Sequence, residues 1–342
     1  MIKLRSILYV LVVMLVAMVS CDEYDTNVMG EKFFPYNSLV TKFRQLVYVE
    51  YKDGKARVWG PYAEKVEYDV DGSHVSIKSD LDSLVVFAFG YAMSDSVNSF
   101  EGDLSVNSAR PYALYLGNLS LESESGTAIK STGVSDCYIV LPDKSKNQLK
   151  GALNVAGALI LDGKGALDIK TGQNTALVAS GGLTCSYNVS ISIASESGNG
   201  VHVENSDLKI ADGNWTIKAG NDAISNASGS VILNGGKIYG HSKNGSFVMS
   251  PIDKGLVAHH TSCIAVSARA SVLAEEARQF IWQAQVDTLS LQADSTFTIN
   301  RTPSTSKTEK EFAKFTPAFD YKTPWVLISD STLIETDWVT FQ

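Results

Sequence analysis

Cysteine and histidine are scarce in this chain of 342 residues, which has four cysteines and five histidines. None of them forms a CxxC pair or a cluster with the spacing of zinc ligands, so the sequence offers no redox motif and no structural zinc site. Long helical patterns are almost absent as well. The apolar run at residues 7–19 is too short to cross a bilayer with margin, which argues against a membrane-spanning helix.

Basic residues are fewer than acidic ones: the chain has 29 Lys and Arg and 37 Asp and Glu, which gives a formal net charge of −8. Loss of Lys3 and Arg5 with residues 1–20 would change this charge by two, from −8 to −10. An acidic surface repels nucleic acid, anionic lipid and anionic glycan unless a divalent cation mediates the contact. We therefore exclude nucleic acid as a partner and expect an anionic glycan to be met only through such a cation.

The N-terminus has the pattern of an export signal. Lys3 and Arg5 precede the apolar run, and Ser20 stands directly before Cys21. This order predicts a signal peptide at residues 1–20. The sequence Met-Val-Ser-Cys at residues 18–21 resembles the lipobox of bacterial lipoproteins, which implies lipidation of Cys21 and a membrane anchor at the outer membrane. Cleavage by an ordinary signal peptidase near the same place is the alternative.

Residues 21–44 are predicted to be the lipidated N-terminus and a linker. The acidic stretch at residues 22–25 resembles an export tag that sends some bacterial lipoproteins to the cell surface. The alternative is a solvated tether, which short polar stretches commonly form.

A repeat occupies the middle of the chain. Pairs of a small and an apolar residue recur every 22 to 25 residues, at Ala128-Ile129, Ala152-Leu153, Ala176-Leu177, Val201-His202, Ala223-Ile224 and Ser246-Phe247. Each repeat holds three short alternating strands separated by Gly, Asn and Asp. The sequence therefore predicts an all-β fold, a right-handed single-stranded parallel β-helix at residues 101–265, in which each repeat is one three-sided coil.

The repeat also predicts what occupies one corner of the coil. Four asparagines each lie two residues before a repeat start, namely Asn174, Asn199, Asn221 and Asn244. Asparagine tolerates turn conformations and bonds to neighbouring main chain, so we expect a structural ladder at this corner. A ligand-binding role for the same ladder is the alternative.

Two of the three cysteines left after Cys21 can be placed in the same repeat. Cys185 aligns with Leu161 and Ile210, which predicts a buried, inert thiol. Cys137 belongs to a coil two layers away. Two layers of about 4.8 Å each exceed the reach of a disulfide, so we expect no bond between Cys137 and Cys185.

Both ends of the coil stack need caps, because bare terminal strands would pair with other chains. We expect an N-terminal β cap at residues 45–100, with hairpin turns at Asp53-Gly54 and Asp71-Gly72. A C-terminal cap is expected at residues 266–342. Its predicted elements are a short helix at residues 272–284 and strands at 289–291, 297–299 and 325–328.

When the repeats are aligned in this way, the chain resembles a family of bacterial carbohydrate-binding β-helix proteins that are related in fold to calcium-dependent polysaccharide lyases. The order of several passages carries the resemblance across residues 45–335. These passages are residues 114–121 (LYLGNLSL), 138–143 (YIVLPD), 150–153 (KGAL), 163–167 (GKGAL), 220–224 (GNDAI) and 315–333 around KTPWVLIS. The resemblance implies polysaccharide binding, with calcium held by carboxylates and carbonyls on the coil surface.

For calcium, the candidate ligand set is Asp207, Asp212 and Asp222, helped by asparagine or main-chain oxygens, since calcium takes six to eight oxygen ligands. Relatives carry a Gly-Asp-Gly-Ile type of turn, of which only Asp222 and an offset Asn199-Gly200 remain here. The alternative is that these are solvated turn acids.

Sugar binding usually relies on exposed aromatic rings. Tyr115 lies between Leu114 and Leu116, and Tyr239 has the opposite parity to Ile238, so both are predicted to face outward and are the candidate carbohydrate-binding residues. Trp215 aligns with the core position of Leu167 and is predicted to be core. Lys209, Lys218 and Lys237 are expected to be outward, solubilising side chains.

No catalytic residues can be assigned. No lysine lies in a motif that identifies it as the base of a lyase, and no pair of carboxylates is singled out for glycosidase chemistry. The sequence thus predicts a non-catalytic, polysaccharide-binding surface lipoprotein, assisted by calcium and attached to the membrane through Cys21. The first alternative is an adhesin-like or structural outer-membrane lipoprotein that binds protein, and the second is a degenerate polysaccharide lyase.

Overall fold

The computed structural model describes residues 42–90 and 101–251 with their side chains, and in addition the backbone of residue 100 and of strands at 256–258, 262–269, 276–283, 288–292, 296–300, 325–329 and 338–341. These residues belong to one compact unit, Leu39–Gln342. The predicted signal peptide, Cys21 and the linker up to residue 41 lie outside the described residues. In the part of the chain described, no helix is long and apolar enough to cross a membrane.

The described residues form a β-solenoid of stacked coils, which confirms the predicted parallel β-helix. Each coil has three faces, called A, B1 and B2 here. Face A is a ten-stranded sheet in which all neighbours are parallel except the hairpin β1–β2. Its strands are β2 (Lys55–Trp59), β1 (Gln45–Lys52), β5 (Leu84–Gly90), β8 (Tyr112–Gly117), β10 (Cys137–Leu141), β12 (Leu159–Gly163), β15 (Leu183–Cys185), β18 (Leu208–Ile210), β21 (Val231–Leu233) and β24 (Leu256–Ala258).

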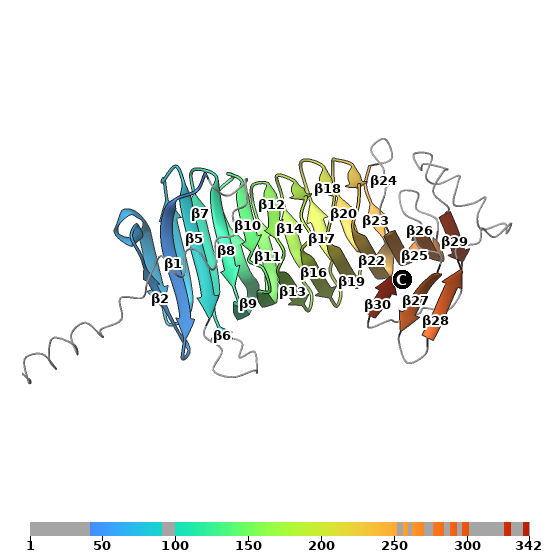
Figure 1. The fold of residues 1–342 in the computed structure, drawn as a ribbon, viewed down its shortest axis with the longest axis horizontal. Helices are drawn as coiled ribbons and strands as arrows, with labels where there is room; N and C mark the ends of the chain where they lie inside the picture. The colour runs from blue at the N-terminus through green and yellow to red at the C-terminus, as the bar shows by residue number, and fades with distance from the viewer. Residues whose placement is uncertain are drawn as a thin grey trace, which may run out of the picture. The chain divides into compact units, whose positions relative to one another are not determined.

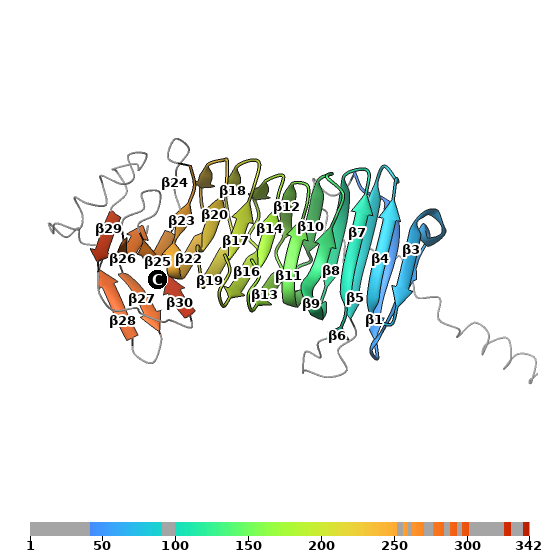
Figure 2. The ribbon, with the colours of Figure 1, turned by 180° about the vertical axis from the view of Figure 1, so that it is seen from behind.

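Faces B1 and B2 share one bent sheet, and Figures 1 and 2 show the strands of successive coils lying side by side. Face B1 consists of β6 (Phe100–Glu101), the first parts of β9 (Ser120–Ser131) and β11 (Lys146–Val155), then β13 (Ala166–Thr171), β16 (Ser190–Ser195), β19 (Asn214–Ala219), β22 (Lys237–Ser246) and β25 (Ser262–Arg269). Face B2 consists of β3 (Glu67–Asp71), β4 (His74–Ser79), β7 (Asp103–Ser108), the second parts of β9 and β11, β14 (Leu177–Ala179), β17 (Val201–Val203), β20 (Ile224–Asn226) and β23 (Val248–Met249).

Alternation along each strand places one set of side chains inside the coil. On face B1, Leu167, Ile191, Trp215 and Ile238 stand in one column, and each is 2 % exposed or less. The prediction that Trp215 belongs to the core is confirmed. Because coils lie about 4.8 Å apart, every apolar side chain in such a column packs on the one above and the one below.

The strand register corrects two of the predicted repeat starts. Leu177 pairs with Val201, and Val201 pairs with Ile224, so the match to Ala176-Leu177 is Gly200-Val201. Similarly, Ile224 pairs with Val248, so that repeat starts at Phe247. The predicted starts at Val201 and Ser246 are therefore displaced by one residue. In the corrected register His202 is an outward residue, which explains why it did not fit the apolar pattern.

The predicted asparagine ladder is present only in part. Asn221 Nδ2 donates to Asn199 Oδ1 at 2.8 Å, and the same oxygen accepts the amide of Asp222 at 3.1 Å. Asn174 instead donates weakly to the carbonyl of Gly126 at 3.4 Å. The one-residue displacement of the register is the reason, because it removes the four asparagines from a common column.

Cys137 and Cys185 occupy the coils predicted from the repeat. Cys185 pairs with Leu161 and Ile210 and is fully buried, which confirms its predicted column. Cys137 lies in a different column, with Tyr112 and Leu159, and both thiols are free. Burial raises the pKa of each thiol to about 12. Both therefore act as small apolar groups within the core.

At the N-terminal end, both predicted hairpins are present. β1 and β2 pair antiparallel around Asp53-Gly54, and β3 and β4 pair antiparallel around Asp71-Gly72. Asp53 and Gly54 have φ of 53° and 72°, the left-handed values that a two-residue hairpin turn needs. Parallel pairing begins here too, since β1 pairs with β5 and β4 pairs with β7.

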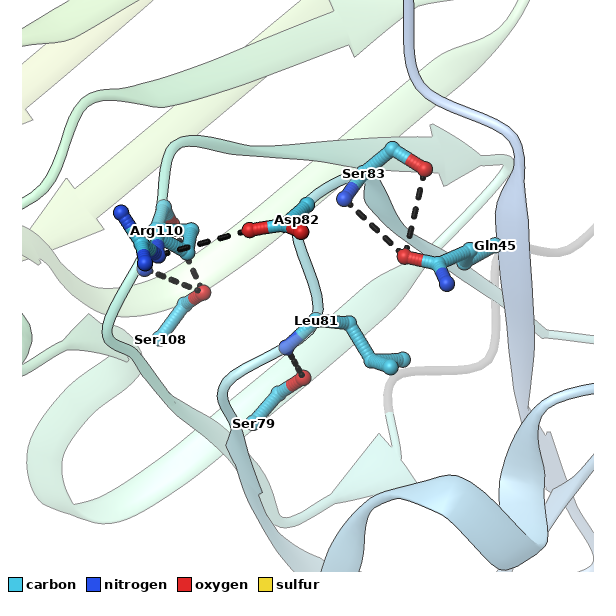
Figure 3. A network of polar contacts seen from close by, with 7 residues as sticks. All are labelled: Gln45, Ser79, Leu81, Asp82, Ser83, Ser108 and Arg110. Carbon is cyan, nitrogen blue, oxygen red and sulfur yellow. Dashed lines mark hydrogen bonds and ion pairs between the residues drawn. The ribbon is translucent and has the colours of Figure 1, made fainter.

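Polar side chains join the turns of these first coils, as Figure 3 shows. Gln45 Oε1 accepts the amide of Ser83 at 3.0 Å and its hydroxyl at 3.2 Å. In the same turn, Asp82 Oδ1 lies 3.4 Å from Nε of Arg110, which belongs to the turn of the next coil. These contacts occupy main-chain groups at a corner where the sheet ladder is interrupted.

At the C-terminal end, β26 (Glu276–Gln283) pairs antiparallel with β25 and with β29 (Trp325–Ser329). A separate sheet holds β27 (Thr288–Gln292), β28 (Thr296–Asn300) and β30 (Trp338–Phe341). The closing strands predicted at 289–291, 297–299 and 325–328 are confirmed. The helix predicted at 272–284 is wrong over residues 276–283, because the edge of β25 offers main-chain partners that outweigh a local helical preference.

Candidate functional site

The outward surface of face B1 carries polar residues in columns that cross the strands. The middle column consists of Gln148, Asp168, Ser192 and Thr216, one residue from each of β11, β13, β16 and β19. These strands follow one another directly in the stack (Figure 2). A molecule lying across the strands would therefore meet a similar set of hydrogen-bonding groups at every coil, about 4.8 Å apart.

A groove of about 430 Å³ follows these columns. Its described lining is Lys146, Asn147, Gln148, Ala166, Leu167, Asp168, Ser190, Ile191, Ser192, Asn214 and Thr216. The hollow has a simple cause, because the outward residues of β16 are Ser190, Ser192 and Ala194, which are all small. Larger polar side chains, Asp168 and Thr216, stand on the strands to either side.

Asp168 and Lys170 form an ion pair on β13. Both face outward because they are two residues apart on one strand, and Lys170 Nζ lies 3.0 Å from Asp168 Oδ2. The other carboxylate oxygen, Oδ1, is buried and has no hydrogen-bond partner among the described residues. An unpaired buried acceptor costs about 1–3 kcal/mol, so this oxygen would gain from a donor brought by a ligand.

The charge of this face differs from that of the whole chain. Outward lysines on face B1 are Lys146, Lys150, Lys170, Lys218 and Lys237. The acids in the same columns are Glu101, Glu122, which lies 2.7 Å from Lys150, and Asp168. Five lysines against three carboxylates make these columns locally basic on a chain whose net charge is −8. This local charge is more favourable to an anionic ligand than the net charge of the chain suggests.

The two tyrosines expected to be exposed are buried. Tyr115 lies outside the core cluster, on the outer side of face A, but it is only 2 % exposed between Phe87 and Val140 of the neighbouring coils. Burial, and then the nearby Asp162, raises its pKa. Tyr239 continues the middle column of face B1 after Thr216 and is 1 % exposed. Alternation gives the side of the sheet, not whether other groups cover that side, so neither ring is an open platform.

The structure does not bring Asp207, Asp212 and Asp222 together. They lie in three different turns, before β18, after β18 and before β20. Each carboxylate accepts a main-chain amide: Asp207 from Ser230 at 3.0 Å, Asp222 from Ser246 at 2.8 Å and Asp212 from the residue that follows it at 2.7 Å. Within the described ranges, no three His, Cys, Asp or Glu side chains are grouped to hold a metal ion. These aspartates serve the turns.

Comparison with protein-family models assigns the chain. A model described as "Carbohydrate-binding domain-containing protein" matches residues 85–311, about two thirds of the sequence. The chain belongs to this carbohydrate-binding family. No curated protein and no solved structure matches it. The groove of face B1 lies wholly within the span that the family model matches.

Reasoning from the sequence missed the residues that line this groove. Asp168, Ser192 and Thr216 alternate with apolar residues on their strands, so the pattern places them outside. It does not distinguish them from the outward residues of faces A and B2. One further signal was available, since three small outward residues in a row on β16 predict a hollow when larger ones flank them.

Proposed function

We propose that the groove on face B1 binds a polysaccharide without transforming it. Membership of the carbohydrate-binding family supports the class of ligand. The observation that supports the location is the open groove with matched polar groups on four consecutive coils. Three coil spacings of about 4.8 Å give a site about 14 Å long, which suits an extended oligosaccharide lying across the strands.

A binding role accounts for the chemistry of the groove better than catalysis does. Glycoside hydrolysis ordinarily uses two carboxyl groups that flank the scissile bond. Asp168 is the single carboxylate in the described lining, and it is already paired with Lys170. Polar groups such as Gln148, Ser192 and Thr216 offer hydrogen bonds to sugar hydroxyls but no activated nucleophile.

The test is calorimetric titration of the purified chain with neutral and acidic polysaccharides. Ser192→Trp fills the hollow and should abolish binding. Ser76→Trp introduces the same side chain at an exposed position of β4 on face B2 and should leave binding unchanged. Loss of binding in both variants, or in neither, would refute the groove as the site.

Two further measurements separate the related claims. Incubation of the chain with each bound polysaccharide should release no new reducing ends, whereas a lyase or hydrolase would release them. Repeating the titration with a chelator tests calcium. The described lining of the groove holds one carboxylate, Asp168, so we expect affinity to survive chelation, and a complete loss would show that calcium is part of the site.

We also propose that the protein is anchored in the outer membrane through a lipid on Cys21, as the lipobox-like sequence at residues 18–21 suggests. Metabolic labelling with a fatty-acid analogue should modify the wild-type chain but not Cys21→Ser. Labelling of both forms, or of neither, would contradict the anchor. Surface display is tested separately, by protease accessibility on intact cells.

A further inference from the structure

The ion pair on β13 does more than line the groove. We infer that Asp168 and Lys170 determine specificity, by binding two neighbouring hydroxyl groups of a neutral sugar unit; this inference rests on the proposed polysaccharide binding. Nothing about the fold requires the pair, because both side chains face outward on a strand whose inward residues, Leu167 and Ile169, are the ones packed in the core.

The geometry of the pair suits a diol. The Asp168 side chain is 28 % exposed and the Lys170 side chain 54 % exposed, so a ligand on the open face can reach both residues. An ionised carboxylate only accepts hydrogen bonds and an ammonium only donates them, whereas each sugar hydroxyl does both. With Nζ and Oδ2 3.0 Å apart, one hydroxyl of a neighbouring pair can donate to Asp168 while the next accepts from Lys170.

The unpartnered oxygen completes this arrangement. Asp168 Oδ2 faces Lys170, while Oδ1 has no hydrogen-bond partner among the described residues. The terminal torsion of an aspartate is broad and two-fold, so a modest rotation turns Oδ1 toward a ligand. The carboxylate can then hold Lys170 with one oxygen and a sugar hydroxyl with the other, without breaking the ion pair.

Charge excludes an acidic sugar at this position. In the middle column Asp168 stands between Gln148 and Ser192, both uncharged, so no second cation lies in that column to offset a carboxylate or sulfate placed over it. Lys170 is already partly neutralised by Asp168. We therefore expect a neutral unit above Asp168, with an acidic unit accepted only away from this column, toward Lys146 or Lys150.

The experiment compares Asp168→Asn and Lys170→Met with the wild-type chain, by titration with one neutral and one acidic oligosaccharide series. Asp168→Asn keeps the shape but removes the charge, and binding of the neutral series should weaken about tenfold. Lys170→Met should weaken it similarly. The double variant should lose less affinity than the product of the two single-variant losses, because the residues act as a pair. Asp69→Asn on β3 makes the same charge change outside the groove and should have no effect.

The outcomes separate this inference from the proposed function. Suppose that the wild-type chain binds glycan and Ser192→Trp abolishes binding, but Asp168→Asn leaves the affinity for the neutral series unchanged. The groove is then still the binding site, and the inferred role of Asp168 in specificity is wrong. Tighter binding of the acidic series by Asp168→Asn, without loss of the neutral series, would show that the groove holds an acidic unit and would overturn the inference. Failure of the wild-type chain to bind any glycan overturns both.

Discussion

The assignment of β16 to a buried and an open side can be tested by stability. Ile193 is 1 % exposed and lies in register with Ile169 and Ile217, so it packs between apolar side chains of two neighbouring coils. Truncation of a buried isoleucine to alanine costs about 2–5 kcal/mol, from lost transfer free energy and the cavity left behind. Because both neighbours are rigid members of the same column, the site has little room to collapse, and we expect Ile193→Ala to fall in the middle of that range.

The matched control lies one residue away. Ser192 faces the groove on the same strand, so Ser192→Ala should change the free energy of unfolding by less than about 0.5 kcal/mol. Urea denaturation followed by tryptophan fluorescence measures both variants. Midpoint and slope are both compared, because long repeat arrays can depart from two-state unfolding. Equal effects of the two variants, or a larger effect of Ser192→Ala, would refute the assignment of the two sides of β16 and with it the groove.

Three further predictions concern the turns and a thiol. Burial raises the pKa of Cys185 from 9.0 to about 12, so between those pH values the unfolded chain binds fewer protons than the folded chain. The free energy of unfolding therefore falls as pH rises, and the urea midpoint should fall less over this pH range in Cys185→Ala than in the wild-type chain. Asn199 Oδ1 accepts two hydrogen bonds, so Asn199→Ala should cost about 1–3 kcal/mol in denaturation experiments, against less than about 0.5 kcal/mol for exposed Asn244→Ala. Gly163 has φ of 105° and an added Cβ would meet the carbonyl of Leu141, whereas Gly172 has open space, so Gly163→Ala should lower the melting temperature and Gly172→Ala should not.

The coil stack could be predicted because its physical cause lies in the local sequence. An inward apolar residue on every short strand, repeated at the length of one coil, leaves few other ways to bury those side chains. The sequence did not determine the strand register to the exact residue, since the small residue that matches Ala176 is Gly200 and not Val201. A rule based on small-plus-apolar pairs accepts either one, and only pairing with the neighbouring coil decides between them.

The site could not be predicted to the same degree, because its properties arise between coils. The tyrosine at position 115 has the parity of an outward residue, yet its neighbours on adjacent coils are Phe87 and Val140, which cover it. Asp168 looks like any outward strand acid until the small residues of β16 are placed beside it. The pattern at 272–284 predicts a helix for the same reason, since the pairing of residues 276–283 with β25 depends on tertiary structure.

The central claim, that face B1 is the glycan-binding surface, is tested most directly by lysine footprinting with and without a bound polysaccharide. Exposed lysines occur on all three faces, with Lys146 and Lys170 on B1, Lys130 on B2 and Lys209 on A. We predict that bound glycan slows acetylation of Lys146 and Lys170 and leaves Lys130 and Lys209 unchanged. Protection of Lys130 or Lys209, with Lys146 and Lys170 still reactive, would contradict the claim.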